Sequence, residues 1–335
     1  MRTQRESSFE LLRLIAQVMI VYYHILLFVV YPTYDLAIYK ALWFPLFVLI
    51  SGYFGIKPSV KGLVKLLGMV FILQLPNTII SIVQGGAKAI LEIPFFISNS
   101  SFWFVRTYVF LYLLSPVVNS FLSKISSRQR LYLLISLFYI SHFVGTFGTD
   151  TSIVGGKNVI TFVFFYVLGD TIRYYAERIK TISTKWLALS FMLLNTTVIL
   201  FFTWFGFSNH LDIIYDRLFN SYTSPFLLLN TLLFFAFFVK VSFSSEMINK
   251  AAQASLAIFI YHRTALLILI GPLLLMVCGK EASVFFVLLM VLVFTIVTVL
   301  TCIFLYWVQK PLWDKVVLLS QLLQTKVDSK LTKQN

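Results

Sequence analysis

Three residues in the first apolar stretch of the chain could do chemistry inside a membrane: Glu10, Arg13 and His24. They lie in FELLRLIAQVMIVYYH, residues 9–24. Eleven residues of α-helix end about 20° past three full turns, so Arg13 and His24 share one helix face, roughly 16 Å apart. Glu10 precedes Arg13 by one turn and can pair with it. This face is a candidate functional face, although Arg13 could instead reach lipid headgroups while His24 bonds a neighbouring carbonyl.

Ionisable residues recur in two later apolar segments. An arginine at the bilayer centre costs about 2.5–3.5 kcal/mol on insertion scales, so each such residue needs a reason. SFWFVRTYVFLYLLSPVVN begins at residue 101 and contains Trp103 and Arg106. SLAIFIYHRTALL begins at residue 255 and carries His262 beside Arg263. Snorkelling alone would explain Arg106, and Trp103 suits a membrane interface. Two ionisable neighbours near mid-membrane favour function, and we expect these four residues to contact substrate.

Three lysines follow the second apolar stretch, in KPSVKGLVK. Lys57, Lys61 and Lys65 are spaced four residues apart and would fall on one face of a helix. The positive charge of cytoplasmic loops is sufficient to account for them. The more specific hypothesis is a binding surface for the phosphates of a cytosolic cofactor.

The composition is that of a polytopic membrane protein. Of 335 residues, 59% are hydrophobic and only 12% are charged, whereas soluble domains average about 25% charged residues. The net charge of +14 could indicate nucleic-acid binding. However, the basic residues lie in short gaps between apolar runs, as they do in the cytoplasmic loops of membrane proteins. We therefore expect membrane lipid, and no nucleic acid, as a partner.

The apolar runs predict an all-α bundle of about ten transmembrane helices, because roughly 20 apolar residues cross a bilayer core as helix. The first run lacks a small-residue cleavage site, so it is expected to be retained. The predicted spans cover approximately residues 9–31, 36–56, 63–84, 101–121, 131–148, 157–175, 185–206, 222–241, 252–277 and 283–309.

The lysines and arginines predict the orientation of these spans. With the N-terminus in the cytoplasm, 19 of the 27 basic residues fall in inner segments and five in outer loops. This bias predicts that both termini are cytoplasmic. Residues 1–312 are expected to form one transmembrane domain and residues 313–335 a polar, Lys-rich cytoplasmic tail. The weakly amphipathic VVLLSQLL of this tail either lies on the anionic inner leaflet or is solvated.

Taken together, these segments resemble the acyltransferase 3 family, polytopic membrane acyltransferases that modify bacterial surface glycans. The first helix is similar to the family's opening signature of an acidic residue, an Arg three later and a His after ten more, with Glu10 where Asp is more usual. Many glycan-acetylating members carry an Arg-x-x-x-Arg pair where this chain has Lys61 and Lys65, which keeps the charge but loses the bidentate fork. Further similar stretches are FPLFVLISGYF, FWFVRTYVFLYLLSP, SLAIFIYH and YWVQKPLW.

The resemblance implies O-acylation, most often O-acetylation, in the bacterial cytoplasmic membrane. The donor would be cytosolic acyl-CoA, most often acetyl-CoA, with its phosphates on the three lysines named above. The acceptor would be a hydroxyl of an extracytoplasmic or lipid-linked glycan such as surface polysaccharide. His24 is the expected general base, because imidazole titrates near neutral pH, with Arg13 and Glu10 on the same helix. No metal is expected. The alternatives are a glycan-lipid transporter or flippase and a non-catalytic subunit of a polysaccharide assembly complex.

Overall fold

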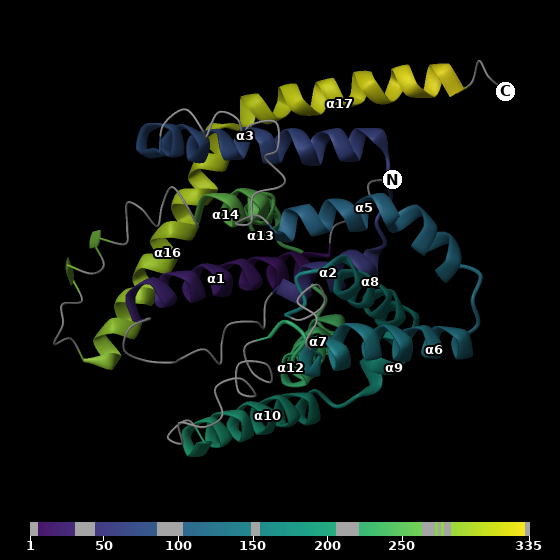
Figure 1. Ribbon diagram of the computed structural model, residues 1–335, viewed down its shortest axis with the longest axis vertical. Coiled ribbons are helices and arrows are strands. Elements are labelled where there is room, and N and C mark those ends of the chain that lie inside the picture. The colour runs from purple at the N-terminus through teal and green to yellow at the C-terminus, as the bar shows by residue number, and fades with distance from the viewer. Residues whose placement is uncertain are drawn as a thin grey trace. The chain divides into compact units, whose positions relative to one another are not determined.

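The structure is a computed structural model of the chain, and it describes residues 6–30, 44–85, 103–148, 155–205, 221–262, 272–273, 276–277 and 283–331. Within these ranges the secondary structure is helical, with no β-strand (Figure 1). The predicted all-α class is therefore confirmed for the described part of the chain. The remaining residues, Arg263 among them, lie outside it.

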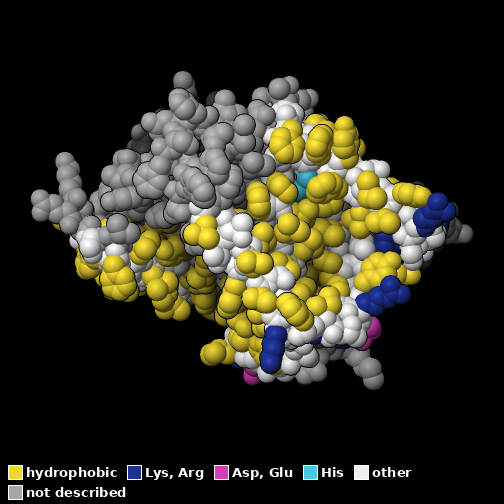
Figure 2. Space-filling model, turned by 90° about the horizontal axis from the view of Figure 1, so that it is seen from below, with side chains coloured by type: hydrophobic (Ala, Val, Ile, Leu, Met, Phe, Trp, Pro, Cys, Tyr) yellow, Lys and Arg dark blue, Asp and Glu magenta, His cyan; other side chains and the backbone are white. Residues whose placement is uncertain are grey.

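Four described segments are long and apolar enough to cross a membrane: Ser7–Leu26, Trp103–Leu122, Ser127–Phe147 and Phe285–Val308. Each overlaps one of the predicted spans. Many large apolar side chains on these helices are exposed, and Figure 2 shows apolar side chains over most of the visible described surface. Such a surface is suited to lipid rather than water. The chain is therefore a membrane protein, while the count of ten spans and the cytoplasmic termini stay predictions.

The contacts of the chain divide it into two compact units, each made of separate segments. The first unit comprises Met1–Ala16, Leu36–Ile56 and Leu114–Asn249, and the second comprises Gln17–Asp35, Lys57–Leu113 and Lys250–Asn335. Helices α1 (Ser7–Val30), α5 (Trp103–Leu122) and α13 (Glu246–Ala252) each contribute residues to both units.

In the first unit, α2 (Phe44–Phe54) packs closely on α8 (Val159–Tyr174) because glycines let the two backbones approach. A Cβ added to Gly52 would lie 2.0 Å from the carbonyl oxygen of Tyr166. A Cβ added to Gly169 would lie 2.3 Å from the carbonyl oxygen of Leu49. The end of the family-like stretch FPLFVLISGYF thus has a packing role, because its Gly52 lies at the contact between the two helices.

The substitution Gly52→Ala is expected to destabilise the first unit, because the added methyl group meets backbone atoms of Tyr166 that cannot rotate away. Overpacking of this kind typically costs about 1–3 kcal/mol. Ser51→Ala is a matched control on the same helix, since it removes only the hydroxyl that donates to the Phe47 carbonyl. Thermal unfolding of the purified protein in detergent measures the difference. Equal melting temperatures for the two variants would contradict the packing argument.

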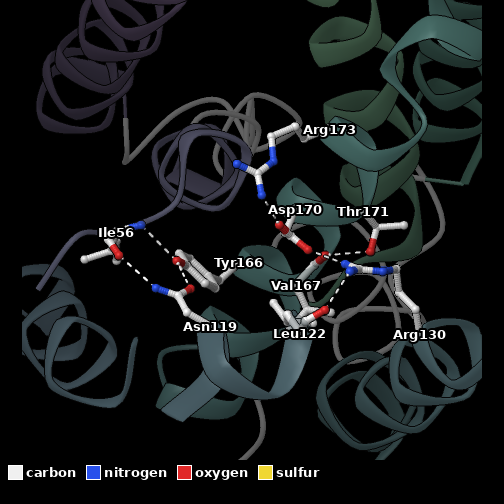
Figure 3. A network of polar contacts seen from close by, with 9 residues as sticks. All are labelled: Ile56, Asn119, Leu122, Arg130, Tyr166, Val167, Asp170, Thr171 and Arg173. Carbon is white, nitrogen blue, oxygen red and sulfur yellow. Dashed lines mark hydrogen bonds and ion pairs between the residues drawn. The ribbon is translucent and has the colours of Figure 1, made fainter. Parts of the chain in front are cut away.

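A closed ring of hydrogen bonds holds the end of α2 (Figure 3). The chain leaves α2 through Gly55, which has a φ of 74°. The Ile56 N–H then donates to Tyr166 Oη at 2.9 Å, and the Ile56 carbonyl accepts from Asn119 Nδ2 at 2.8 Å. The ring closes where Tyr166 Oη donates to Asn119 Oδ1 at 2.7 Å. Both backbone polar groups of Ile56 are therefore satisfied by side chains from α8 and α5.

A buried ion pair joins α6 (Ser127–Phe138) to α8. The Arg130 side chain donates to the Asp170 carboxylate and, at 3.1 Å, to the Leu122 carbonyl oxygen (Figure 3). Asp170 also accepts from Arg173 at 2.8 Å. Arg130 is only 6% exposed, so its charge depends on these partners.

The other helices of the first unit pack on their neighbours in pairs. The six-residue π-helix η4 extends α6, and α10 packs on α12. The amides of Asn195 on α10 and Asn230 on α12 exchange two hydrogen bonds, each of 2.8 Å. The bounds are η4 Tyr139–Val144, α7 Gly145–Phe147, α9 Ala176–Thr181, α10 Thr184–Phe205 and α12 Pro225–Lys240.

In the second unit, the short helix α14 (Ser255–Tyr261) packs on α3 (Val60–Gly85) and α16 (Val284–Val308). The ninth predicted span, 252–277, therefore begins differently from the expectation. Its first residue ends α13, and a turn at Gln253 and Ala254 separates α13 from α14. The turn forms because the N–H groups of these two residues donate to carbonyls only three positions back.

The predicted tail forms a helix up to residue 331. Helix α17 (Lys310–Leu331) lies alongside α3, as Figure 1 shows. Gln324 Oε1 accepts from the backbone N–H of Lys61 at 3.0 Å, and Val316 packs on Gly68. The amphipathic VVLLSQLL stretch thus contacts another helix of the protein, an arrangement that neither expectation for this tail included.

Candidate active site

Two histidines from distant parts of the sequence meet in the second unit. His24 lies on α1, and His262 directly follows the last residue of α14. Nδ1 of His24 is 3.1 Å from Nε2 of His262, and the ring centroids are 4.9 Å apart. His262 is buried, with 2% of its surface exposed. Both residues are among those expected from the sequence to act, and the structure brings them into direct contact.

Backbone carbonyls define which ring nitrogens of the pair carry protons. Nδ1 of His24 lies 2.9 Å from the Ile20 carbonyl oxygen. Nδ1 of His262 lies 2.8 Å from the Ile258 carbonyl oxygen. Because a carbonyl oxygen can only accept, we assign the proton of each neutral ring to Nδ1. The lone pair of His24 is then on Nε2, the atom that can take a proton from a hydroxyl.

The position of His262 depends on how the end of α14 is held. Three residues of this helix are completely buried: Ala257, Ile258 and Ile260. Tyr261 Oη donates to Gln309 Oε1 at 2.7 Å, at the junction of α16 and α17. Gln309 belongs to the YWVQKPLW segment, so this family-like stretch supports the helix end that carries His262.

A series of aromatic contacts links Trp103 to the histidine pair. The ring of Trp103 lies 5.9 Å from Phe104, and Phe104 lies 5.4 Å from Phe259. Phe259 in turn lies 6.1 Å from the His262 ring. Arg106, one turn after Trp103, is half-buried and makes no hydrogen bond or ion pair to either histidine within the described residues. Trp103, one of the expected substrate-binding residues, is therefore linked to His262 through aromatic rings.

Glu10 and Arg13 form the predicted ion pair. Arg13 donates to the Glu10 carboxylate at 2.7 Å, one turn apart on α1, which confirms the pairing. The Ser7 hydroxyl lies 3.0 Å from Asn249 Oδ1 and accepts from the Ser245 N–H at 2.8 Å, so the start of α1 is held within the first unit. Eleven helical residues, roughly 16 Å, separate Arg13 from His24, so the ion pair does not contact the imidazole.

Gln17 is a further candidate site residue, which the motifs in the sequence did not single out. It follows Arg13 by four residues and precedes His24 by seven, so all three lie on one face of α1. Its side chain is buried, and its Oε1 has no hydrogen-bond partner among the described residues. A buried acceptor without a donor costs about 1–3 kcal/mol. The sequence did carry one sign of this residue, because a glutamine stands at helical spacing between Arg13 and His24.

The three lysines surround the first turn of α3. Lys57 and Lys65 are exposed, and Lys61 is partly exposed. Ser59 caps this turn, because its Oγ accepts from the backbone N–H of Gly62 at 3.0 Å. Tyr112 Oη accepts from the Ser59 N–H at 3.0 Å. Ammonium groups beside a helix N-terminus favour anions, so this end of α3 is suited to a phosphorylated ligand.

Metal ligands do not gather in the part of the chain that the structure describes. No group of three or more His, Cys, Asp or Glu side chains lies close enough there to hold a metal ion. Among the described residues, the arrangement suited to acid–base chemistry is the pair of imidazoles in contact.

Within the described residues, these features define a helical membrane protein in which two imidazoles from separate helices are in contact. The acyltransferase 3 family model, described as an acyltransferase domain, matches residues 6–308. The match covers nearly the whole chain, so the chain belongs to this family, and the resemblance drawn from its motifs is confirmed. No curated protein and no solved structure shows a significant match.

Proposed function

We propose that this membrane acyltransferase moves an acyl group, most simply acetyl, from cytosolic acyl-CoA to a hydroxyl of an extracytoplasmic or lipid-linked glycan. The observation that carries the proposal is the state of His24. Its Nδ1 is bonded to a backbone carbonyl, which leaves the lone pair on Nε2 within a membrane helix of an acyltransferase chain. Acyl transfer to a hydroxyl needs such a base to accept the proton of the attacking hydroxyl.

The proposed reaction forms one bond and breaks one bond. The hydroxyl oxygen attacks the thioester carbonyl carbon while its proton passes to Nε2 of His24. The carbon–sulfur bond then breaks, and the proton passes from His24 to the departing thiolate. The products are an O-acyl glycan and free CoA thiol. A positioned general base contributes about 10²–10⁴ to such a rate.

Charged groups on the chain support a donor that enters from the cytoplasm. The phosphates of acyl-CoA would bind Lys57, Lys61 and Lys65, and Arg13 adds positive charge on α1. The flexible arm of the donor would carry the thioester toward His24, which lies some 16 Å from Arg13 along α1. The hydrocarbon core is about 30 Å thick. In this proposal Trp103, Arg106 and Arg263 contact the glycan.

Removing Lys61 and Lys65 together is expected to weaken donor binding without slowing the chemical step. We expect the Lys61→Gln/Lys65→Gln variant to raise KM for acetyl-CoA about tenfold at unchanged kcat, because contacts to phosphates are the same in ground and transition states. Initial rates in proteoliposomes with acetyl-CoA and purified acceptor polysaccharide measure both constants. Lys124→Gln, a basic residue in the first unit, is the control. An unchanged KM would mean that the lysines serve only topology.

The function is tested in cells that lack this chain and in the same cells with the chain restored. Surface polysaccharide is purified from both, and its base-labile acyl groups are quantified by NMR. The proposal predicts that these groups disappear without the chain and return with it, while the polysaccharide is exported in equal amount. Unchanged acyl groups would overturn the proposal. Absence of the polysaccharide itself would favour a flippase or an assembly subunit.

A further inference from the structure

We infer that His262 is a positioning residue that accepts the Nδ1 proton of His24 in a hydrogen bond and so makes His24 a stronger base. The inference rests on the proposed function and changes the role of His262, which the sequence placed among the substrate-binding residues. It identifies a two-imidazole relay whose members lie 238 positions apart in the sequence.

The direction of the hydrogen bond follows from the carbonyls that face the two rings. If Nε2 of a neutral His262 were the donor, its Nδ1 would direct a lone pair at the Ile258 oxygen, 2.8 Å away. Nδ1 of His24 would likewise direct a lone pair at the Ile20 oxygen, 2.9 Å away. Both arrangements are repulsive. In the reverse direction every N–H meets an acceptor, and Nε2 of His262 receives the proton of His24 Nδ1.

The relay acts when His24 takes the proton of the acceptor hydroxyl. The His24 ring becomes an imidazolium, and its Nδ1–H bond to Nε2 of His262 becomes charge-assisted and stronger. A full shift of that proton to His262 would leave a lone pair of His24 Nδ1 facing the Ile20 oxygen. The positive charge therefore stays mainly on His24, where Nε2 of His262 stabilises it inside an apolar bundle. When Nε2 of His24 protonates the thiolate, both rings return to their starting state.

A neutral imidazole is well suited to this position. A carboxylate would stabilise the imidazolium more strongly, but a buried carboxylate is costly whenever its partner is neutral. The buried His262 ring adds no charge between turnovers. It is also held rigidly, since its backbone N–H and its Nδ1 both donate to Ile258 and the Phe259 ring lies beside it. This orientation directs Nε2 of His262 at Nδ1 of His24, 3.1 Å away.

Kinetics of two variants separate positioning from substrate binding. His262→Phe removes the acceptor nitrogen but keeps an aromatic ring, and we expect kcat to fall about 10–100-fold with KM unchanged for donor and acceptor. His262→Gln offers an oxygen that can accept the Nδ1 proton, so most of kcat should return. The inference is overturned if His262→Phe keeps full kcat, if only KM for the glycan rises, or if the Gln variant is as slow as the Phe variant.

A spectroscopic readout tests the relay without turnover. The chain has four histidines, so ¹⁵N-histidine labelling of the purified protein gives few signals, which single substitutions assign. We expect a scalar coupling across the hydrogen bond between Nδ1 of His24 and Nε2 of His262, lost in both His262 variants and kept in His142→Phe. Turnover by the wild-type protein without this coupling would overturn the relay. The coupling without any acyl transfer would instead refute the proposed function.

Discussion

Replacing His24 with alanine is expected to abolish acyl transfer while the amount of folded protein in the membrane stays the same. The substitution removes the Nε2 lone pair that His24 can present to a hydroxyl, and loss of a general base slows such a step by about 10²–10⁴. The side chain lies on a helix, α1, whose backbone hydrogen bonds do not need it. The measurement is the NMR quantity of acyl groups on purified polysaccharide, at matched protein levels.

His142→Phe is the matched control for this prediction. His142 is also a buried imidazole within a predicted span, but its ring packs against Phe164, 4.5 Å away, and its Nδ1 bonds to Ser141. A phenyl ring can take this place, so acyl transfer should continue. Acyl groups at wild-type level in His24→Ala cells would show that the general base is elsewhere. If the alanine variant is poorly folded, His24→Phe repeats the test with a ring of similar size.

The second large effect is expected from Asp170→Ala, which should strongly destabilise the protein. Arg130 would keep a charge that is 6% exposed but lose its carboxylate partner (Figure 3). Breaking a buried pair in this way costs about 3–5 kcal/mol. Thermal and denaturant unfolding in detergent measure the loss. Activity per folded molecule should stay near the wild-type value, in contrast to His24→Ala.

Two further variants make the second prediction specific. Glu177→Gln breaks an exposed pair with Lys180, and exposed pairs contribute little, so its unfolding should match that of the wild type. Asp170→Leu combined with Arg130→Leu removes both charges and should recover much of the stability that Asp170→Ala loses. If Asp170→Ala unfolds at the wild-type temperature, the ion pair does not stabilise this unit.

The features that were predictable from the sequence are those that act along one helix. The spacing of Glu10 and Arg13 predicted their ion pair, because three residues of helix place two side chains one turn apart. The apolar runs predicted the helical membrane class for the same reason, since length and composition alone decide whether a helix suits a bilayer. The same periodicity places Gln17 on the face of Arg13 and His24, although only its burial makes it a candidate.

Contacts between separate helices could not be predicted from the spacing of residues along the sequence. The lysines at the start of α3 were evident from their spacing, but the contact of α17 with Lys61 was not. The glycine contacts of Gly52 and Gly169 depend on how closely two backbones approach, and a glycine in a sequence carries no sign of its neighbour. The six-residue π-helix η4 also lies inside an apolar run whose pattern is that of an ordinary helix.

The sequence by itself determined the class of protein, the family and His24 as the candidate base, because composition, motif order and helical spacing are local properties of a chain. Only the tertiary structure decided that His262 contacts His24 and that Asp170 neutralises Arg130. These pairs form where separate helices pack, and packing depends on the shapes of all the side chains between them. Both histidines of the candidate site were therefore marked by motifs in the sequence, and the fold decided that they contact each other.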